Sequence, residues 1–466
     1  MAIELTGSGL TLDDVLRVAR GGEAVELAPA AVEAMRAARA VAEEAVAQGV
    51  AAYGVTTGVG MRKAFGVEAA DHDRILIRQH LIGQGPGAPR DVVRATALRL
   101  ANALAGGLTP VRAETAQLVV EALNEDRLPE VRLLGSAGQA DLAPLADLVD
   151  GILGERGLAP GEAIALLNQN AYATAWGALA FHDAGVLLDA LDAAGALDLE
   201  ALGANPDLLH PAIAAARPST GVRETLARLR ELRHGSEVEV RSLQDPLSFR
   251  TLPQLHGAVR DAFRFVRGQL ELELNAAQAN PLVVVSERRL VSVGNFEAQA
   301  LATALDVARL ALAPALATAA ERAVKLLQAP LTGLPEGLGA RRGLAESALS
   351  ELGIAVQAFA AEARLLAQPV SLELVSTQQA EAIEDRTTMA PLAGRRLAEM
   401  VELGARVVAV ELCLAAQACE LRGARLGAGT ARVQAAVRSV IPFVGIGDPL
   451  PDLEPLVALV RRGGLA

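Results

Sequence analysis

The chain has 466 residues and a net charge of −12, and 52% of its residues are hydrophobic while only 2% are aromatic. This length is ample for a buried core, so disulfide or metal staples are unnecessary. The acidic balance, with only two lysines, argues against a nucleic-acid surface, because phosphate binding needs concentrated positive charge. The apolar residues are mainly alanine, leucine and valine, and alanine and leucine favour closely packed helices.

The N-terminal part predicts short helices and loops. Thr11 is followed three residues later by Asp14, the pattern of a capping box, so a helix is expected to begin there. A second, alanine-rich helix is expected over residues 28–48. The glycines of residues 54–60 interrupt both the helical and the strand period, which predicts a loop beside Tyr53.

The rest of the chain predicts long helices, because apolar residues recur at three- and four-residue spacing. The segments expected to be helical are 91–121 and 161–191, each with glycine or proline breaks, then 224–232, 252–275, 296–327, 344–367 and 386–421. One hairpin is expected, with residues 282–285 paired to 290–293. A helical bundle is the natural interpretation.

The cysteine spacing and the N-terminal sequence indicate the cellular location to expect. Cys413 and Cys419 lie six residues apart in a helical stretch, which places them on different faces, so buried free thiols are expected. No basic region precedes an apolar run at the N-terminus, and no stretch of about twenty uncharged apolar residues follows. We therefore expect a cytoplasmic protein without a membrane segment. The histidines show no metal-ligand spacing, so no metal site is expected.

Eight short motifs follow one another along the chain. They begin at Tyr53 (Tyr-Gly-Val-Thr-Thr-Gly-Val-Gly), Gln79 (Gln-His-Leu-Ile-Gly-Gln-Gly), Gly135 (Gly-Ser-Ala-Gly-Gln-Ala-Asp-Leu-Ala-Pro-Leu), Leu166 (Leu-Leu-Asn-Gln-Asn), Gln244 (Gln-Asp-Pro-Leu-Ser-Phe-Arg), Glu273 (Glu-Leu-Asn-Ala-Ala-Gln-Ala-Asn-Pro), Gly294 (Gly-Asn-Phe-Glu) and Glu384 (Glu-Asp-Arg-Thr-Thr-Met). The series resembles the motifs of the aromatic amino-acid ammonia-lyase family, which includes histidine and phenylalanine ammonia-lyases.

The resemblance implies a fold and an assembly. It implies an all-α protein with a smaller N-terminal lobe of helices and loops, residues 1–200, and a long helical bundle with the C-terminal helices, residues 201–466. It also implies a homotetramer whose active sites draw on several subunits.

The loop that begins at Gly135 departs from the family at its chemical centre. There the family reads Gly-Ser-x-Gly-Ala-Ser-Gly-Asp-Leu-Ala-Pro-Leu, and its Ala-Ser-Gly cyclises into an electrophile, methylidene-imidazolone. In this chain Gln139 and Ala140 replace that tripeptide. Cyclisation favours a glycine amide as the attacker and needs a middle residue that can lose a β-hydroxyl, and neither 137–139 nor 138–140 supplies both. We therefore expect no methylidene-imidazolone and no other cofactor.

The resemblance also implies roles for individual residues. Tyr53 matches the catalytic base, and Arg250 matches the arginine that holds the substrate carboxylate. The other matched positions are His80 and Glu384 at active-site places and Asn168, Asn295 and Phe296 at substrate-binding places. Glu297 stands where the family has histidine, and we count it among the candidate catalytic residues. Further departures are Gln79 for serine, Leu247 for tyrosine and Ala279 for aspartate.

Each candidate has a structural alternative. Tyr53 could be a buried structural phenol, and Arg250 could be a core ion-pair partner of Asp245 or Glu384. His80 could be a core histidine, and the amides of Asn168 and Asn295 could serve only to satisfy buried backbone groups. Burial beside an apolar Phe296 would raise the pKa of Glu297 unless Arg250 or another cation lies near it.

The expected function is that of a lyase-like enzyme working without methylidene-imidazolone. Base-catalysed elimination, addition or cyclisation on a small carboxylate or an amino-acid-derived substrate is the expected chemistry. A catalytically silent homologue that serves as a partner of an active lyase, and a small-molecule binding protein, are the alternatives. Retention of Tyr53 together with Arg250 favours the enzyme, because a silent relative has little reason to keep a base and a carboxylate clamp.

Overall fold

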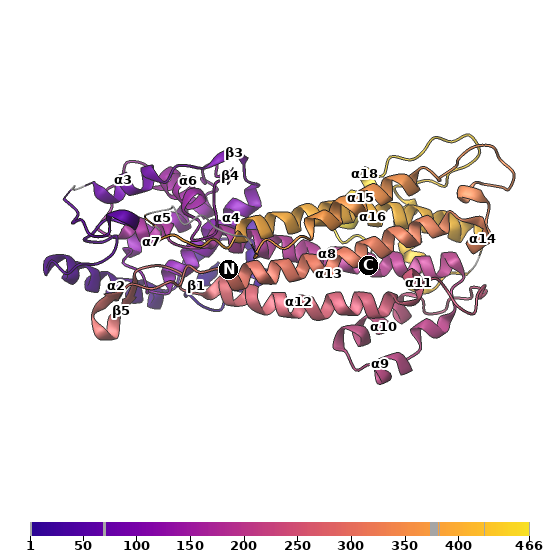
Figure 1. Ribbon diagram of the computed structural model, residues 1–466, viewed down its shortest axis with the longest axis horizontal. Helices are drawn as coiled ribbons and strands as arrows, with labels where there is room; N and C mark the ends of the chain where they lie inside the picture. Colours follow the sequence, from indigo (N-terminus) through magenta and orange to yellow (C-terminus); the bar gives the residue numbers. More distant parts are fainter. Residues whose placement is uncertain (1, 69–70, 373–380, 382, 424, 466) are drawn as a thin grey trace. The chain divides into compact units, whose positions relative to one another are not determined.

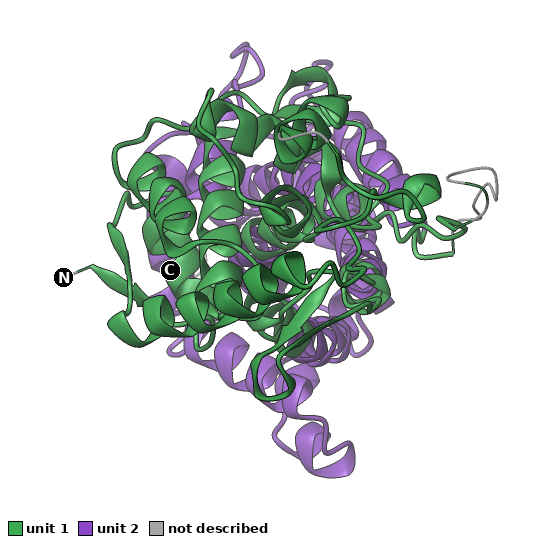
Figure 2. Ribbon diagram, turned by 90° about the vertical axis from the view of Figure 1, so that its left-hand side faces the viewer, with its two compact units in different colours: residues 1–180, 267–305, 369–395 green, residues 181–266, 306–368, 396–466 purple. Residues whose placement is uncertain are grey.

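The computed structural model describes residues 2–68, 71–372, 381, 383–423 and 425–465, and the protein is mostly helical, which confirms the predicted fold class (Figure 1). The chain divides into two compact units, each assembled from three stretches of sequence. Unit 1 comprises residues 1–180, 267–305 and 369–395, and unit 2 comprises residues 181–266, 306–368 and 396–466 (Figure 2). The lobe boundary near residue 200 stays a prediction.

Unit 1 holds short helices, with three two-stranded sheets among the described residues. In chain order its elements are β1 (Ile3–Leu5), α1 (Leu12–Ala19), β2 (Val25–Leu27), α2 (Pro29–Ala47), η1 (Gly60–Arg62), α3 (His72–Gln79), β3 (Gln84–Gly87), α4 (Arg90–Ala105), α5 (Ala113–Asn124), β4 (Arg132–Leu134), α6 (Leu142–Leu153), α7 (Glu162–Leu167), β5 (Leu282–Val284), η3 (Val285–Glu287) and β6 (Arg289–Val291). The predicted capping box is confirmed, since the Thr11 hydroxyl accepts from the Asp14 N–H at 3.1 Å. The predicted hairpin is confirmed too, with Leu282 opposite Val291 in an antiparallel pair.

Unit 2 is built from further helices and turns. They are η2 (Pro206–Leu209), α9 (Ala212–Ala216), α10 (Thr220–Leu232), α11 (Leu247–Arg250), α14 (Ala329–Thr332), η4 (Glu336–Leu338), α15 (Leu352–Leu366), α17 (Ala428–Arg438) and α18 (Glu454–Arg461). Helix α15 starts eight residues later than predicted. Ala348 has a φ of +48°, and the Leu349 N–H donates to the Gly337 carbonyl at 3.0 Å, so a tertiary contact holds this stretch in a turn.

Four long helices contribute residues to both units. They are α8 (Ala171–Leu202), α12 (Leu252–Asn275), α13 (Gln299–Leu326) and α16 (Ala390–Arg422). Helix α13 is long and apolar enough to cross a membrane by length and composition, a test that a buried core helix also passes. It contains Arg309 and Arg322, both fully buried, and this matches a core helix.

Small residues let the helices pack closely, as the composition predicted. In unit 2, a Cβ added at Gly221 of α10 would lie 2.0 Å from the Gly257 carbonyl of α12, so the two backbones touch. In unit 1, a Cβ at Gly394 of α16 would lie 2.7 Å from the Cβ of Trp176 on α8. Any larger residue at either glycine would push two helices apart.

A fully buried ion cluster joins three long helices within unit 2. Arg322 of α13 donates through Nε to Asp198 of α8 and to Glu411 of α16, each at 2.8 Å, and all three side chains are fully buried. Burial raises the pKa of Asp198 well above its usual value, and the nearby charge of Glu411 raises it further. The cluster therefore favours the protonated form of Asp198, which leaves one carboxylate for one guanidinium.

Candidate active site

Tyr53 lies in the loop after α2 and is half-buried. Its hydroxyl oxygen accepts a hydrogen bond from the Gly60 N–H at 2.9 Å. Burial raises the pKa of Tyr53, the negative charge of Glu384 raises it further, and the Gly60 N–H opposes both. A backbone donor on the phenol oxygen stabilises the phenolate, as a tyrosine base requires.

Glu384 is the carboxyl whose charge acts on Tyr53, and both residues belong to unit 1. Burial raises the pKa of Glu384, and the charge of Asp385 adds to this effect. A carboxylate with a raised pKa accepts protons more readily than an ordinary glutamate. Tyr53 and Glu384, which come from two separate motifs, therefore interact electrostatically in the structure.

His80 follows the last turn of α3. Its Nδ1 lies 2.7 Å from the Leu76 carbonyl oxygen. Because a carbonyl oxygen can only accept, Nδ1 must carry a proton, and in the neutral ring Nε2 keeps its lone pair. The histidine is therefore oriented by its own helix, with one nitrogen left for other contacts.

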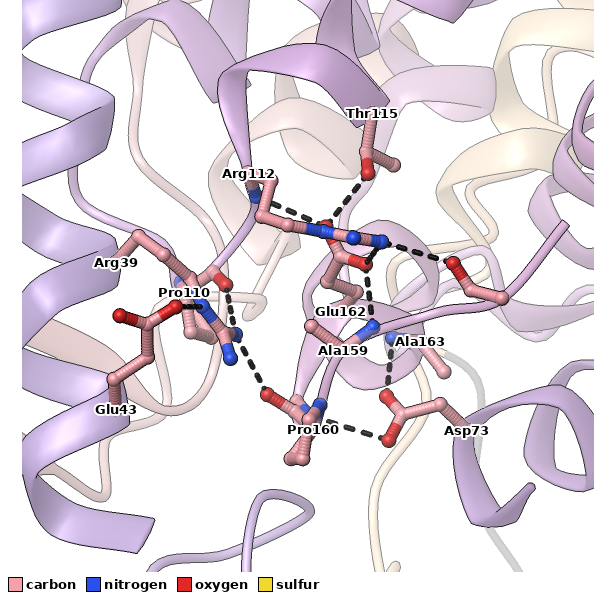
Figure 3. Close-up of polar contacts among 12 residues, drawn as sticks. Arg39, Glu43, Asp73, Pro110, Arg112, Thr115, Ala159, Pro160, Glu162 and Ala163 are labelled. Atoms are coloured by element: carbon pink, nitrogen blue, oxygen red, sulfur yellow. Dashed lines mark hydrogen bonds and ion pairs between the residues drawn. The ribbon is translucent and has the colours of Figure 1, made fainter. Parts of the chain in front are cut away.

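Helices α3 and α7 are joined by hydrogen bonds, which Figure 3 shows. Asp73 of α3 accepts from the backbone N–H groups of Gly161 at 3.3 Å and Ala163 at 2.7 Å, so it caps α7. Burial raises the pKa of Asp73 to about 6. His80 ends α3 and Asn168 follows α7, so this cap sets the positions of two candidate residues.

Glu162, in the first turn of α7, anchors the other side of the same region (Figure 3). Its fully buried carboxylate accepts from the Thr115 hydroxyl at 2.7 Å and from Arg112 Nη2 at 2.6 Å. Arg39 of α2 donates to the carbonyl oxygens of Pro110 and Pro160, both at 2.9 Å. These charge-assisted hydrogen bonds fix α2, α5 and α7 relative to one another.

The candidate asparagines satisfy backbone groups. Asn168 is buried, and its Nδ2 donates to the Asn280 carbonyl at 3.1 Å. Asn295 is exposed and donates to the Ala277 carbonyl at 3.2 Å. Phe296 is half-buried, and its carbonyl accepts from Asn170 Nδ2 at 2.5 Å. These contacts fit the structural alternative for both asparagines, while their place in the substrate pocket stays a prediction.

The loop of residues 135–141 is held from two sides. On one side the Ser136 hydroxyl donates to Asp141 at 2.8 Å, and burial raises the pKa of Asp141 to about 6. On the other side Thr388 Oγ1 donates to the Gly138 carbonyl at 2.8 Å, and the Met389 N–H donates to the Ala137 carbonyl at 2.9 Å. Gly138 has a φ of +81°, and an added Cβ would lie 2.5 Å from Thr388 Oγ1, so glycine is required there.

Glu297 meets the loop and a cation. Its carboxylate accepts from Gln139 Nε2 at 3.2 Å and from the Gln299 N–H at 3.1 Å, and it lies 3.4 Å from Arg386 Nε. Its side chain is 37% exposed. The sequence left open whether a cation would lie beside Glu297, and Arg386 is that cation. The motifs identified Gln139 and Glu297 separately as departures but did not single out Arg386, and only the structure shows that Gln139 and Arg386 both contact Glu297.

Arg250 ends α11 in unit 2 and is exposed. Its positive charge opposes the burial that raises the pKa of Asp245. An exposed guanidinium is free to form a bidentate pair with a carboxylate ligand. Among the described residues, no group of three or more histidine, cysteine, aspartate or glutamate side chains could hold a metal ion.

The helical fold and the ordered motifs together define a lyase. The chain belongs to the aromatic amino acid lyase family, whose model matches residues 10–158 and 153–439. Histidine ammonia-lyase of Symbiobacterium thermophilum is 36% identical, covering 100% of this chain and 97% of its own length, and that of Stigmatella aurantiaca is 35% identical, covering 99% and 97%.

Two solved structures extend the comparison. The ergothioneine-degrading enzyme ergothionase from Treponema denticola, in complex with desmethyl-ergothioneine sulfonic acid, has a TM-score of 0.93 at 27% identity and covers 100% of this chain and 99% of its own. Histidine ammonia-lyase from Trypanosoma cruzi has a TM-score of 0.90 at 29% identity, with coverages of 100% and 94%.

These relatives overturn two predictions. Histidine ammonia-lyases at 30–36% identity over the full chain indicate an enzyme of the methylidene-imidazolone-dependent class, so the predicted cofactor-independent function and the predicted lack of a cofactor are wrong. The loop of this chain is Ala137-Gly138-Gln139-Ala140, which does not fit an Ala-Ser-Gly cyclisation.

Proposed function

We propose that this lyase eliminates the amine from histidine or a closely related imidazole amino acid. The names of the full-length relatives support histidine as the substrate. The proposal rests on Tyr53. Its hydroxyl accepts a hydrogen bond from the Gly60 N–H, and the charge of Glu384 raises its pKa. The expected assembly is a homotetramer in the cytoplasm.

In the proposed reaction Tyr53 acts as the base. Its raised pKa means that the resting side chain is a phenol, and the carboxylate of Glu384 is the group that takes the phenol proton. The phenolate then removes the substrate Cβ proton. The C–H electron pair forms the Cα–Cβ double bond while the C–N bond breaks, and the amine leaves with its electron pair. Asn168 and His80 of unit 1 line the polar part of the proposed site. Arg250 belongs to unit 2, and its proposed role as the clamp of the substrate carboxylate rests on the family resemblance, which implies active sites that draw on several subunits.

The first test replaces Tyr53 with phenylalanine. Tyr53→Phe removes only the hydroxyl, so kcat for release of the unsaturated acid should fall by roughly a hundredfold or more, the usual scale for a positioned acid–base group. In the wild type, kcat/KM should rise with pH as Glu384 ionises around its raised pKa, because only its carboxylate can take the Tyr53 proton, and this rise should disappear in the variant. The unsaturated imidazole acid is followed by its ultraviolet absorbance.

Arg250→Lys provides a second test of the proposed function. Lysine keeps the positive charge but cannot donate two parallel hydrogen bonds to a carboxylate. It should raise KM for histidine more than it lowers kcat, and the effect should be smaller for histidinamide, which has no carboxylate. Wild-type turnover that survives Tyr53→Phe unchanged would show that Tyr53 is not the base.

A further inference from the structure

Two amide side chains next to Glu297 leave acceptor oxygens unpaired. Asn170 Oδ1 and Gln139 Oε1 are both buried atoms without a hydrogen-bond partner among the residues that the structure describes. Asn170 is fully buried, and an unpaired buried acceptor costs about 1–3 kcal/mol. Such oxygens are therefore candidates for a ligand that donates hydrogen bonds.

The orientations of both amides follow from their partners. Asn170 Nδ2 lies 2.5 Å from the Phe296 carbonyl oxygen, and Gln139 Nε2 lies 3.2 Å from a Glu297 carboxylate oxygen. Both partners only accept, so the nitrogens must face them and the oxygens are the unpaired atoms. Asn170 and Gln139 thus reach the same two-residue segment, Phe296–Glu297, from two different loops.

The position of Asn170 explains why its oxygen is free. Asn170 precedes α8, where an asparagine usually accepts from an N–H of the first turn. Here Asp141 takes that place, because its carboxylate accepts from the Ala173 N–H at 2.8 Å. Asp141 also offsets the positive end of the α8 dipole, so the first turn of α8 does not repel a cation.

Arg386 determines which kind of donor fits. It lies 3.4 Å from the Glu297 carboxylate and donates to Gln299 Oε1 at 3.3 Å, so it offsets the charge of Glu297. The cluster therefore offers three acceptor groups, two amide oxygens and one carboxylate, with little net negative charge. Such a site selects N–H donors rather than positive charge alone.

We infer that Asn170, Gln139 and Glu297 form a binding site for the primary ammonium group of the substrate. A primary ammonium carries three N–H donors and can satisfy both amide oxygens and the carboxylate. A trimethylammonium group has the same charge but no N–H, and it would leave both amide oxygens unpaired. This inference rests on the proposed function and adds to it a selection for primary amines.

The test compares histidine with its Nα-trimethyl betaine. Both are titrated calorimetrically into Tyr53→Phe protein, in which turnover should be slowed by roughly a hundredfold or more. Histidine should bind at least about tenfold more tightly than the betaine, the scale of one hydrogen bond to a charged group. When Asn170→Ala or Gln139→Leu is added to the Tyr53→Phe protein, the preference for histidine over the betaine should fall to about threefold or less. The loss should come mainly from weaker histidine binding.

Asn102→Ala is the matched control. Asn102 is also a buried asparagine of unit 1 that donates to a backbone carbonyl, that of Leu274 at 3.1 Å, but its oxygen is already paired with the Gly7 N–H. A purely structural loss should affect both ligands equally, so this variant should keep the wild-type preference.

The outcomes separate the two proposals. A preference that persists in Asn170→Ala and Gln139→Leu overturns the ammonium site, even if histidine is turned over. Selective histidine binding without turnover in the wild type supports the site and overturns the proposed reaction. If neither ligand binds, both proposals fail.

Discussion

Asp141 places an ionisable carboxyl where water does not reach. Burial raises its pKa to about 6 in the fold, well above the ordinary value for an aspartate. A carboxyl with a raised folded pKa stabilises the protein fully below its unfolded pKa, and that contribution is lost as pH rises through the folded pKa. Its loss therefore falls between about pH 4 and pH 6.

We expect Asp141→Asn to remove this component. The wild type should lose about 3 kcal/mol of unfolding free energy from this group as pH rises from 4 to 7, whereas the variant should show a correspondingly flatter profile. Denaturant unfolding at several pH values measures it. Asp261 is the control of opposite sign, because its pKa is lowered, and Asp261→Asn should steepen the loss of stability with rising pH. Identical profiles for Asp141→Asn and wild type would contradict the buried-proton interpretation.

At the scale of elements, the buried cluster of Arg322, Asp198 and Glu411 joins α13, α8 and α16. Arg322→Met would leave two carboxyls buried without a cation, so the unfolding free energy should fall by about 3–5 kcal/mol. Asp198→Asn should cost much less, because one carboxylate still pairs with one guanidinium. Chemical denaturation followed by circular dichroism checks both variants. An Asp198→Asn cost equal to that of Arg322→Met would mean that Asp198 is ionised in the fold.

The sequence predicted the helices better than the tertiary contacts that modify them. Helix α12 (Leu252–Asn275) has the predicted bounds because its apolar periodicity and its ends are both local signals. Helix α15 was predicted too early because the contact of Leu349 with Gly337 overrides local helix propensity. Strands β1 and β2 were not predicted, since three-residue strands carry almost no periodic signal.

The same limit applies to the site. Comparison of the motifs identified Gln139 and Glu297 as unusual but not Arg386, and no local pattern links residues so far apart in sequence. The unpaired oxygen of Asn170 depends on Asp141 capping α8, which only the three-dimensional arrangement shows. The cofactor prediction is wrong for a related reason, because the change in one loop does not outweigh the similarity of the whole chain.

At the scale of the whole molecule, α15 presents an apolar stripe. Ile354, Ala358, Ala361 and Leu365 are all exposed and recur at helical spacing, and Ile354 and Leu365 are each 70% exposed. Gln357 of the same helix donates to Glu321 of α13 at 3.3 Å, which fixes the orientation of the stripe within unit 2. Exposed stripes of this kind mark contact surfaces between chains.

We expect the stripe to be buried in the proposed homotetramer. Replacing both Ile354 and Leu365 with glutamate should lower the mass measured by light scattering below that of a tetramer, while the circular dichroism spectrum stays helical. Leu272→Glu, at a 56% exposed leucine of α12, is the control for adding charge to an apolar surface position. A wild-type protein that is monomeric at micromolar concentration would rule out the assembly itself.

The contact of Trp176 with Gly394 has an optical consequence. Trp176 is the only tryptophan of the chain, it is 7% exposed, and its ring meets Tyr172 edge to face at 6.4 Å. Intrinsic fluorescence therefore reports on one buried place in unit 1, next to the start of α16. Far-ultraviolet circular dichroism, by contrast, averages over the helices of both units. The pair of signals distinguishes a local change around α16 from unfolding of the whole chain without any added label.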